Sequence, residues 1–114
     1  MNAKKELVSI MRKYGLDEKS ILCAAISIGF DFMDEYQQYD DDYENRMAIL
    51  KLGYDEKELP RFFESLNVNY NDGFGCQQLF GYVLFKDRTW LERHEYDGSE
   101  WWEYKRFVVP EICR

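Results

Sequence analysis

The chain has 114 residues, of which 46% are hydrophobic and 18% aromatic, and its formal net charge is −7. This length predicts a single domain, residues 1–114, with enough apolar side chains for a core without disulfide or metal staples. The acidic balance argues against direct nucleic-acid binding and against anionic membranes, because both would repel most of the surface. No charged-then-apolar leader is visible, and the longest apolar stretch is too short for a bilayer, so we expect a soluble, cytoplasmic protein.

The first part of the chain, residues 3–66, is predicted to be helical. Apolar side chains at helical spacing indicate a helix over residues 3–14, and Gly15 follows as a stop signal. Asp17 is a typical N-cap residue, and the apolar residues over 22–36 then form one helical stripe. We therefore expect a second helix there, at the centre of the core.

Two more helices are predicted before the sheet begins. Apolar positions indicate one over residues 42–52, with Gly53 ending it. A short helix is expected over residues 58–66, where Pro60 suits the first turn because its missing N–H would have no partner there. Residues 67–75, rich in Asn and Gly, then predict a loop.

The last part of the chain, residues 79–109, is predicted to be a sheet. Three aromatic and apolar runs indicate strands over residues 79–85, 89–96 and 100–109. The Asp-Gly pair between the last two is a strong hairpin signal. The predicted fold class is therefore α+β, with the N-terminal helices packed on one face of a C-terminal antiparallel three-stranded meander.

The last hairpin has two plausible registers. A two-residue loop, Asp97 and Gly98, would set Glu92 opposite Glu103, and facing like charges are unfavourable. A three-residue loop that includes Tyr96 shifts the pairing by one position and avoids this contact. It forms an aromatic pair, a cation–π contact and an ion pair: Trp90 with Tyr104, Arg93 with Trp101 and His94 with Glu100. We therefore favour the three-residue loop.

An acidic run without Lys or Arg occupies the middle of the chain. Its candidate partner-binding residues are Asp31, Asp34, Glu35, Tyr36, Tyr39, Asp40, Asp41, Asp42, Tyr43 and Glu44. Interleaved tyrosines are typical of binding interfaces, so the run is either a solvated surface or a patch that docks on a basic groove. A calcium loop is excluded, because Asn45 stands where glycine is required and Lys51 where the bidentate Glu belongs.

The three cysteines, Cys23, Cys76 and Cys113, are an odd count without zinc spacing. They indicate a reducing compartment, and no cofactor or metal is predicted. We expect Cys23 to lie in the core and Cys113 to be exposed. An alternative function is a small thiol-dependent enzyme, in which His94, the only histidine, would activate Cys76. The simpler interpretation is a buried thiol at Cys76 and a histidine paired with a glutamate on a strand face.

A second alternative is a binder of single-stranded nucleic acid that uses the aromatic sheet. The stacking residues would be Tyr82, Trp90, Trp101, Trp102 and Tyr104. Arg88, Arg93, Lys105 and Arg106 would supply positive charge. Four glutamates on the same hairpin oppose this function, because the net field there is not positive: Glu92, Glu95, Glu100 and Glu103.

Residues 72–81, 89–93 and 95–103 together resemble the C-terminal module of small phage-encoded proteins of uncharacterised activity. The most specific part is the string Glu-Tyr-Asp-Gly-Ser-Glu-Trp-Trp at residues 95–102. At the preceding turn those proteins have Lys-Asp-Gly, whereas this chain has Arg88 after Lys-Asp. The resemblance implies a phage origin, and small acidic phage proteins often bind and disable host machinery.

The leading functional hypothesis is therefore a non-enzymatic phage inhibitor, similar in action to an anti-CRISPR protein. Its acidic run would block a basic nucleic-acid-binding surface on a host protein, such as a CRISPR effector, in the bacterial cytoplasm. The sequence does not indicate which protein is the partner, nor the oligomeric state.

Overall fold

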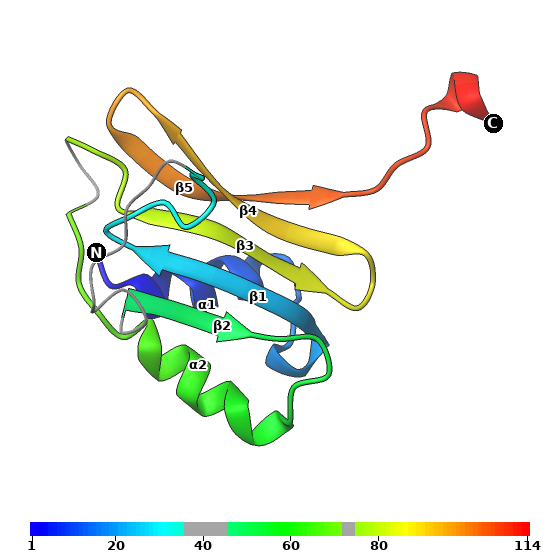
Figure 1. Cartoon of the computed structure of the whole chain (residues 1–114). Coiled ribbons are helices and arrows are strands. Elements are labelled where there is room, and N and C mark those ends of the chain that lie inside the picture. Colours follow the sequence, from blue (N-terminus) through cyan, green and yellow to red (C-terminus); the bar gives the residue numbers. More distant parts are fainter. Residues whose placement is uncertain (36–45, 72–74) are drawn as a thin grey trace.

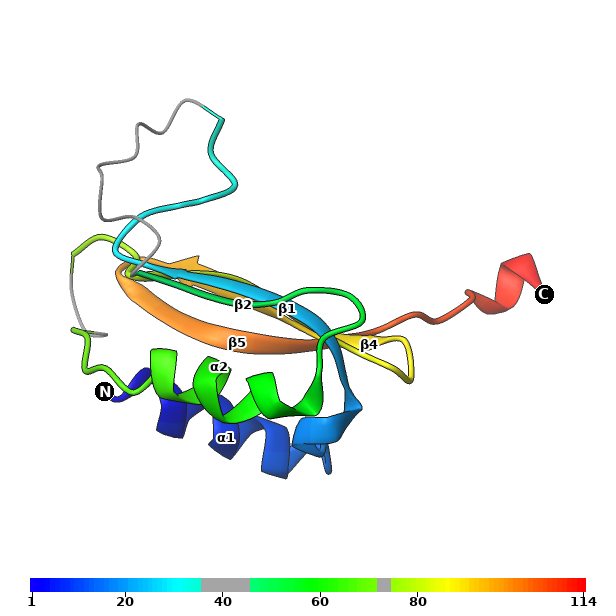
Figure 2. The same cartoon turned by 60° about the horizontal axis from the view of Figure 1, so that its bottom comes forward.

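The computed structural model describes residues 1–35, 46–71 and 75–114. Its elements, in chain order, are α1 (Ala3–Lys13), β1 (Ile21–Ile28), β2 (Met47–Leu50), α2 (Leu59–Ser65), β3 (Leu79–Phe85), β4 (Thr89–Tyr96) and β5 (Ser99–Arg106). The strands form one antiparallel sheet in the order β2-β1-β3-β4-β5. Both helices lie on one face of this sheet, and the segment after β5 projects away from it (Figures 1 and 2).

The α+β class is as predicted, and helix α1 matches its predicted range. The Asn2 side chain caps the helix by accepting a hydrogen bond from the Lys5 backbone N–H at 3.0 Å. Gly15 follows with φ +65°, a left-handed conformation that suits glycine after a helix end. The face that α1 buries against the sheet consists of Ala3, Leu7 and Met11.

The predicted second helix over residues 22–36 is wrong, because this segment begins with strand β1. Asp17 does act as a cap, but only for the single 3₁₀ turn Glu18–Ser20 that precedes the strand. The side chains of Ala24 and Ile26 are buried toward the helices, while Cys23, Ala25 and Ser27 face the other way. A central strand with apolar residues on both faces shows no clear alternation, so its residues also fit a helical stripe.

The predicted third helix over residues 42–52 is also wrong in its described part, where β2 pairs antiparallel with β1. Residues 42–45 lie outside the described residues. The predicted fourth helix is confirmed as α2. A capping box between Asp55 and Glu58 precedes α2, and Pro60 lies in its first turn.

Within the described residues the sheet therefore has five strands, and the predicted three-stranded meander forms only its β3–β5 part. Strands β3 and β4 have their predicted bounds, whereas β5 ends at Arg106, earlier than expected. Strands β1 and β3 lie so close at Gly81 that a Cβ added there would sit 2.0 Å from the carbonyl oxygen of Ala25. Only glycine fits this position.

The predicted register of the last hairpin is wrong. Strands β4 and β5 are joined by the two-residue turn, so Tyr96 faces Ser99 and Glu92 faces Glu103. Asp97 and Gly98 both have positive φ, +51° and +83°, as in the tight turns whose twist matches that of two paired strands. This register sets Arg93 opposite Trp102 on the helix side of the sheet.

A buried ion network on the helix side explains why this register is stable. The fully buried guanidinium of Arg93 lies 2.9 Å from a carboxylate oxygen of Glu6 in α1 and 2.8 Å from one of Glu100 in β5. Arg93 also donates a hydrogen bond to the Tyr70 hydroxyl at 2.7 Å, and that hydroxyl donates to Glu6. Strand β4 is thus bound to α1, to β5 and to the loop after α2.

The network alters the ionisation of its members. Burial alone would lower the pKa of Arg93, but its hydrogen bonds to Glu6 and Glu100 raise that pKa above the usual value. Burial, followed by the hydrogen bond to Glu6, raises the pKa of Tyr70 as well. Arg93 therefore stays charged and Tyr70 stays neutral in the folded protein.

Candidate interaction surface

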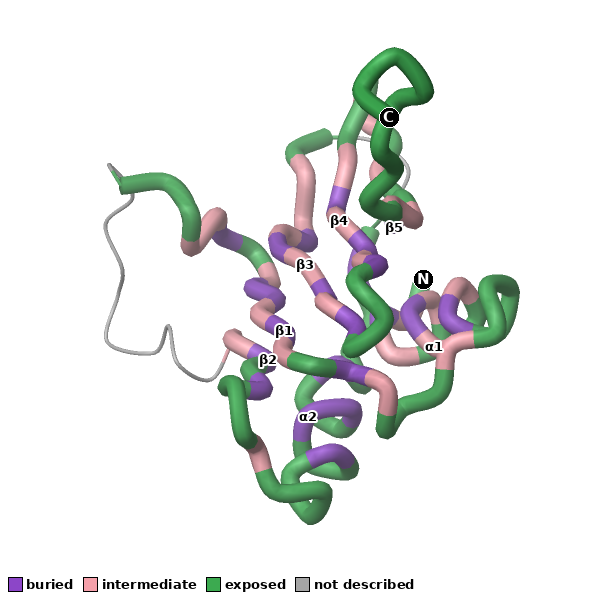
Figure 3. The backbone as a smooth tube through the Cα atoms, turned by 90° about the vertical axis from the view of Figure 1, so that its right-hand side faces the viewer, coloured by how far each residue is buried: buried purple, intermediate pink, exposed green. Residues whose placement is uncertain are grey.

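The sheet face opposite the helices, here called the open face, is the candidate interaction surface. Strand β3 shows how the sequence divides between the two sides, because its buried and half-buried residues alternate along its length (Figure 3). The strand registers place the following residues on the open face: Cys23, Ala25, Ser27, Met47, Ile49, Phe80, Tyr82, Leu84, Trp90, Glu92, His94, Trp101, Glu103 and Lys105.

The centre of the open face is a shallow aromatic depression. It has a volume of about 370 Å³ and is lined by Tyr82, Leu84, Trp90 and Glu92. The register pairs Tyr82 with Glu92 and Leu84 with Trp90 across strands β3 and β4. A half-buried aromatic surface with one carboxylate suits contact with a partner that carries both apolar and basic groups.

A cluster of charged groups crosses the open face beside this depression. Glu92 accepts hydrogen bonds from Lys105 Nζ at 2.9 Å and from the Trp90 indole at 3.3 Å, and it contacts the His94 ring at 2.9 Å. The Lys105 hydrogen bond is the main cause of a lowered pKa at Glu92, and Glu92 in turn raises the pKa of Lys105. The second ring nitrogen of His94 lies 3.4 Å from Glu103. These contacts offset the repulsion between the two facing glutamates.

The segment after β1 folds over one end of the open face. The Phe32 ring packs against Tyr82, with ring centroids 6.3 Å apart. Beneath it, the buried hydroxyl of Ser27 donates to the Phe30 carbonyl oxygen at 2.5 Å and accepts from the Phe32 N–H at 3.4 Å. The acidic run therefore starts at the edge of the aromatic surface.

Of the predicted partner-binding residues, the structure describes the first three. Asp31 is half-buried and accepts a hydrogen bond from the Met33 N–H at 2.9 Å, while Asp34 and Glu35 are exposed. The others lie outside the described residues: Tyr36, Tyr39, Asp40, Asp41, Asp42, Tyr43 and Glu44. Whether the run forms one acidic patch stays a prediction.

The three cysteines and the histidine lie in different elements of the fold. His94 is paired with two carboxylates on a strand face, as the simpler interpretation predicted. Cys76 is exposed in the loop before β3, so the expectation of a buried thiol there is wrong. Cys113 is exposed as expected, whereas Cys23 lies half-buried on the open face, not in the core, and burial raises its pKa. Within the described residues, no group of three His, Cys, Asp or Glu side chains could hold a metal ion.

The aromatic residues proposed for nucleic-acid stacking are divided between the two faces. Tyr82, Trp90 and Trp101 lie on the open face, but Trp102 and Tyr104 point toward the helices. Arg93, expected to supply positive charge, is buried in the ion network. The open face therefore offers fewer stacking residues and one cation fewer than the nucleic-acid hypothesis requires.

Sequence reasoning missed the groups that organise the helix side, Glu6 and Tyr70. Both are far from Arg93 along the chain, and no local pattern connects them to it. None of the described helices is long and apolar enough to cross a membrane.

No protein-family model, curated protein or solved structure matches the chain with significance.

Proposed function

We propose that this protein is a non-enzymatic interaction module that binds a basic surface of another protein through the acidic run and the open face together. The observation that carries the proposal is the packing of Phe32 on Tyr82. This contact fixes the beginning of the acidic run beside the aromatic depression. A partner that meets the run would also meet Tyr82 and Trp90.

The two parts of this surface have different physical roles. Carboxylates without neighbouring lysines in sequence attract a basic surface over a distance, which raises the association rate and gives specificity. Large aromatic side chains that are already half-buried lose little conformational freedom on binding and dominate affinity. The fixed aromatic part should therefore set the dissociation rate, and the acidic part the dependence on salt.

The partner class that we propose is a host protein with a basic nucleic-acid-binding groove, such as a CRISPR effector. The carboxylates of the run would take the place of nucleic-acid phosphates in that groove, so the protein would act as an inhibitor. The resemblance of residues 72–81, 89–93 and 95–103 to phage-encoded proteins supports this assignment.

The test is competition between this protein and DNA for a panel of purified CRISPR effectors, measured by fluorescence anisotropy of a labelled target duplex. The triple variant Asp40→Asn, Asp41→Asn, Asp42→Asn should lose about tenfold or more in inhibition, and the loss should shrink at high salt. The matched control removes the same charge elsewhere, through Glu18→Gln, Glu56→Gln and Glu111→Gln, and should inhibit like the unaltered protein. Equal inhibition by the two triple variants would reject the acidic mechanism, and no inhibition of any effector would reject the partner class.

A further inference from the structure

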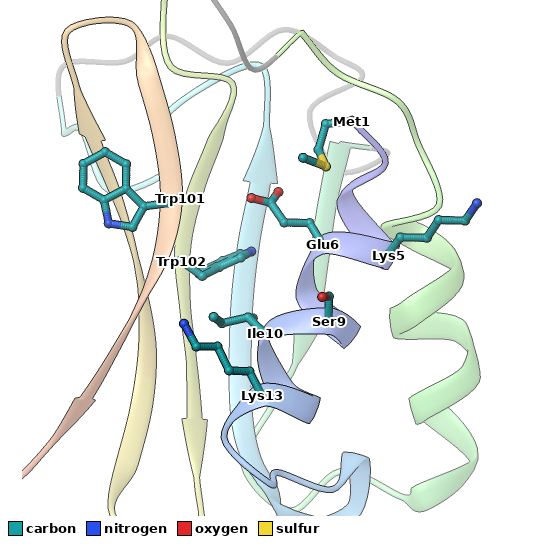
Figure 4. A pocket seen from close by; sticks show the side chains of 8 residues that line it. All are labelled: Met1, Lys5, Glu6, Ser9, Ile10, Lys13, Trp101 and Trp102. Atoms are coloured by element: carbon teal, nitrogen blue, oxygen red, sulfur yellow. The ribbon is translucent and has the colours of Figure 1, made fainter.

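A groove runs between helix α1 and strand β5, and it shares no lining residue with the aromatic depression of the open face. It has a volume of about 480 Å³. Glu6, Ile10 and Lys13 of α1 line one side, and Trp101 and Trp102 of β5 line the other (Figure 4). A volume of this size is typical of sites that receive a ligand or several side chains.

The wall of this groove contains a hydrogen-bond donor without a partner. Trp102 is only 5% exposed, and its indole N–H makes no hydrogen bond in the described part of the chain. The nitrogen end of the ring points toward α1 (Figure 4). Buried polar groups are nearly always paired, because leaving one unpaired costs free energy. The geometry therefore calls for an acceptor that enters the groove.

Strand β5, beside the groove, is an edge strand with a free backbone edge. Among the described strands it pairs only with β4, and the two-residue turn makes Tyr96 and Ser99 a hydrogen-bonded pair. By alternation, Glu100, Trp102 and Tyr104 direct their backbone N–H and C=O groups away from β4. Among the described residues, these groups make no backbone hydrogen bond to another element. An edge of this kind is a template for an added strand.

The charge of α1 indicates what kind of strand would fit. In a chain of net charge −7, the helix carries four basic residues, Lys4, Lys5, Arg12 and Lys13. Its one acidic residue, Glu6, is paired with Arg93. Lys13 extends toward β5 (Figure 4), and its only described contact is with the Tyr14 ring at 5.6 Å. A negative side chain is the complement of this wall.

We propose that an extended segment of another polypeptide adds to β5 as a sixth strand and directs an Asp or Glu side chain into the groove. One carboxylate oxygen accepts the hydrogen bond of the Trp102 indole, and the other lies near Lys13. Backbone pairing along β5 supplies affinity, and the carboxylate supplies specificity, as in other cases of strand addition. Because side chains alternate along a strand, a neighbouring apolar residue two positions away would meet Ile10.

The test begins with a selection of linear 12-residue peptides from a random display library on the immobilised protein. The enriched peptides should share an Asp or Glu with an apolar or β-branched residue two positions away. In such a peptide, alternate backbone N–H groups would point toward β5. Methylation of those nitrogens should abolish binding, whereas methylation of the nitrogens that point away from β5 should not. A selection that enriches no peptide, or only peptides without a carboxylate, would overturn the proposal.

The site is then located with two lysine variants and one spectrum. Lys13→Gln should weaken binding of an enriched peptide by about fivefold to tenfold, whereas Lys57→Gln, which removes an exposed charge elsewhere, should not. In an amide–proton correlation spectrum, the Trp102 indole signal, assigned with Trp102→Phe, should move downfield when peptide is added. Movement of the Trp90 indole signal instead, or equal affinity of both lysine variants, would place the binding elsewhere and contradict the proposal.

Discussion

Each face of strand β4 carries an ion-paired side chain, but the pair on one face is buried and the pair on the other is exposed to solvent. Arg93 is fully buried on the helix side and is paired with Glu6 and Glu100. Its neighbour Glu92 lies on the open face with a side chain that is 41% exposed, paired with Lys105. Adjacent residues of one strand thus form a structural ion network and a solvent-accessible one.

This difference shows that burial, and not the kind of contact, determines how much an ion pair contributes to the stability of the fold. Removing one partner of a buried pair leaves a charge that water cannot solvate. An exposed pair is worth little, because water and salt replace the lost partner. The helix side should therefore determine stability, while the open face is free to be used for binding.

The largest effect is expected from breaking the buried network. Arg93→Ala should reduce the free energy of unfolding by about 3–5 kcal/mol, because Glu6 and Glu100 would remain buried without their cation. Urea denaturation followed by tryptophan fluorescence measures this change. Arg61→Ala, an exposed arginine on α2, is the control and should alter stability by less than about 0.5 kcal/mol. A similar loss in both variants would mean that the network does not hold the fold.

A smaller effect on the same side should appear at alkaline pH. The pKa of Tyr70 is raised in the folded state, so the unfolded chain ionises first, near its ordinary value of 10.0. Stability from this group is present below that value and falls as pH rises above it, by about 1.4 kcal/mol per pH unit.

Thermal unfolding between pH 9 and 11 measures this dependence, and Tyr70→Phe should flatten it. Other tyrosines and lysines also titrate in this range, so the difference between the two proteins is the relevant quantity. An unchanged slope in Tyr70→Phe would show that the buried hydroxyl does not contribute.

The smallest effect is expected from the open face at acid pH. The pKa of Glu92 is lowered in the folded state, so its contribution is present above its ordinary value of 4.5 and is lost as pH falls below it. Because the side chain is exposed, Glu92→Gln should cost less than about 1 kcal/mol at neutral pH. Denaturation at pH 7 and at pH 3 measures the difference, which should vanish at the lower pH. If Glu92→Gln lost more unfolding free energy at pH 7 than Arg93→Ala, the open face and not the helix side would determine stability.

The sequence predicts those elements whose signals are local. Helix α2 follows from Pro60, which suits a first turn, and strands β3 and β4 follow from runs bounded by turns. The residues of strand β1 also fit a helical pattern, because both faces of the strand contact other groups and this hides the alternation of Ala24 and Ile26.

The hairpin register could not be predicted because its deciding contacts are distant in sequence. Cross-strand pairs alone favoured the register that separates Glu92 from Glu103. The observed register instead depends on Glu6 and Tyr70, which reach Arg93 from two other elements. The groove beside β5 was missed for the same reason, since α1 and Trp102 meet only in the folded chain.

The position of Arg93 next to Glu92 also limits how the strands can misalign during folding. A slip of β4 by one residue would exchange the two faces. Glu92 would then approach Glu6 without a cation between them, and Arg93 would point to solvent. Such a mispaired intermediate would be strongly disfavoured, so the adjacent opposite charges select a single strand alignment.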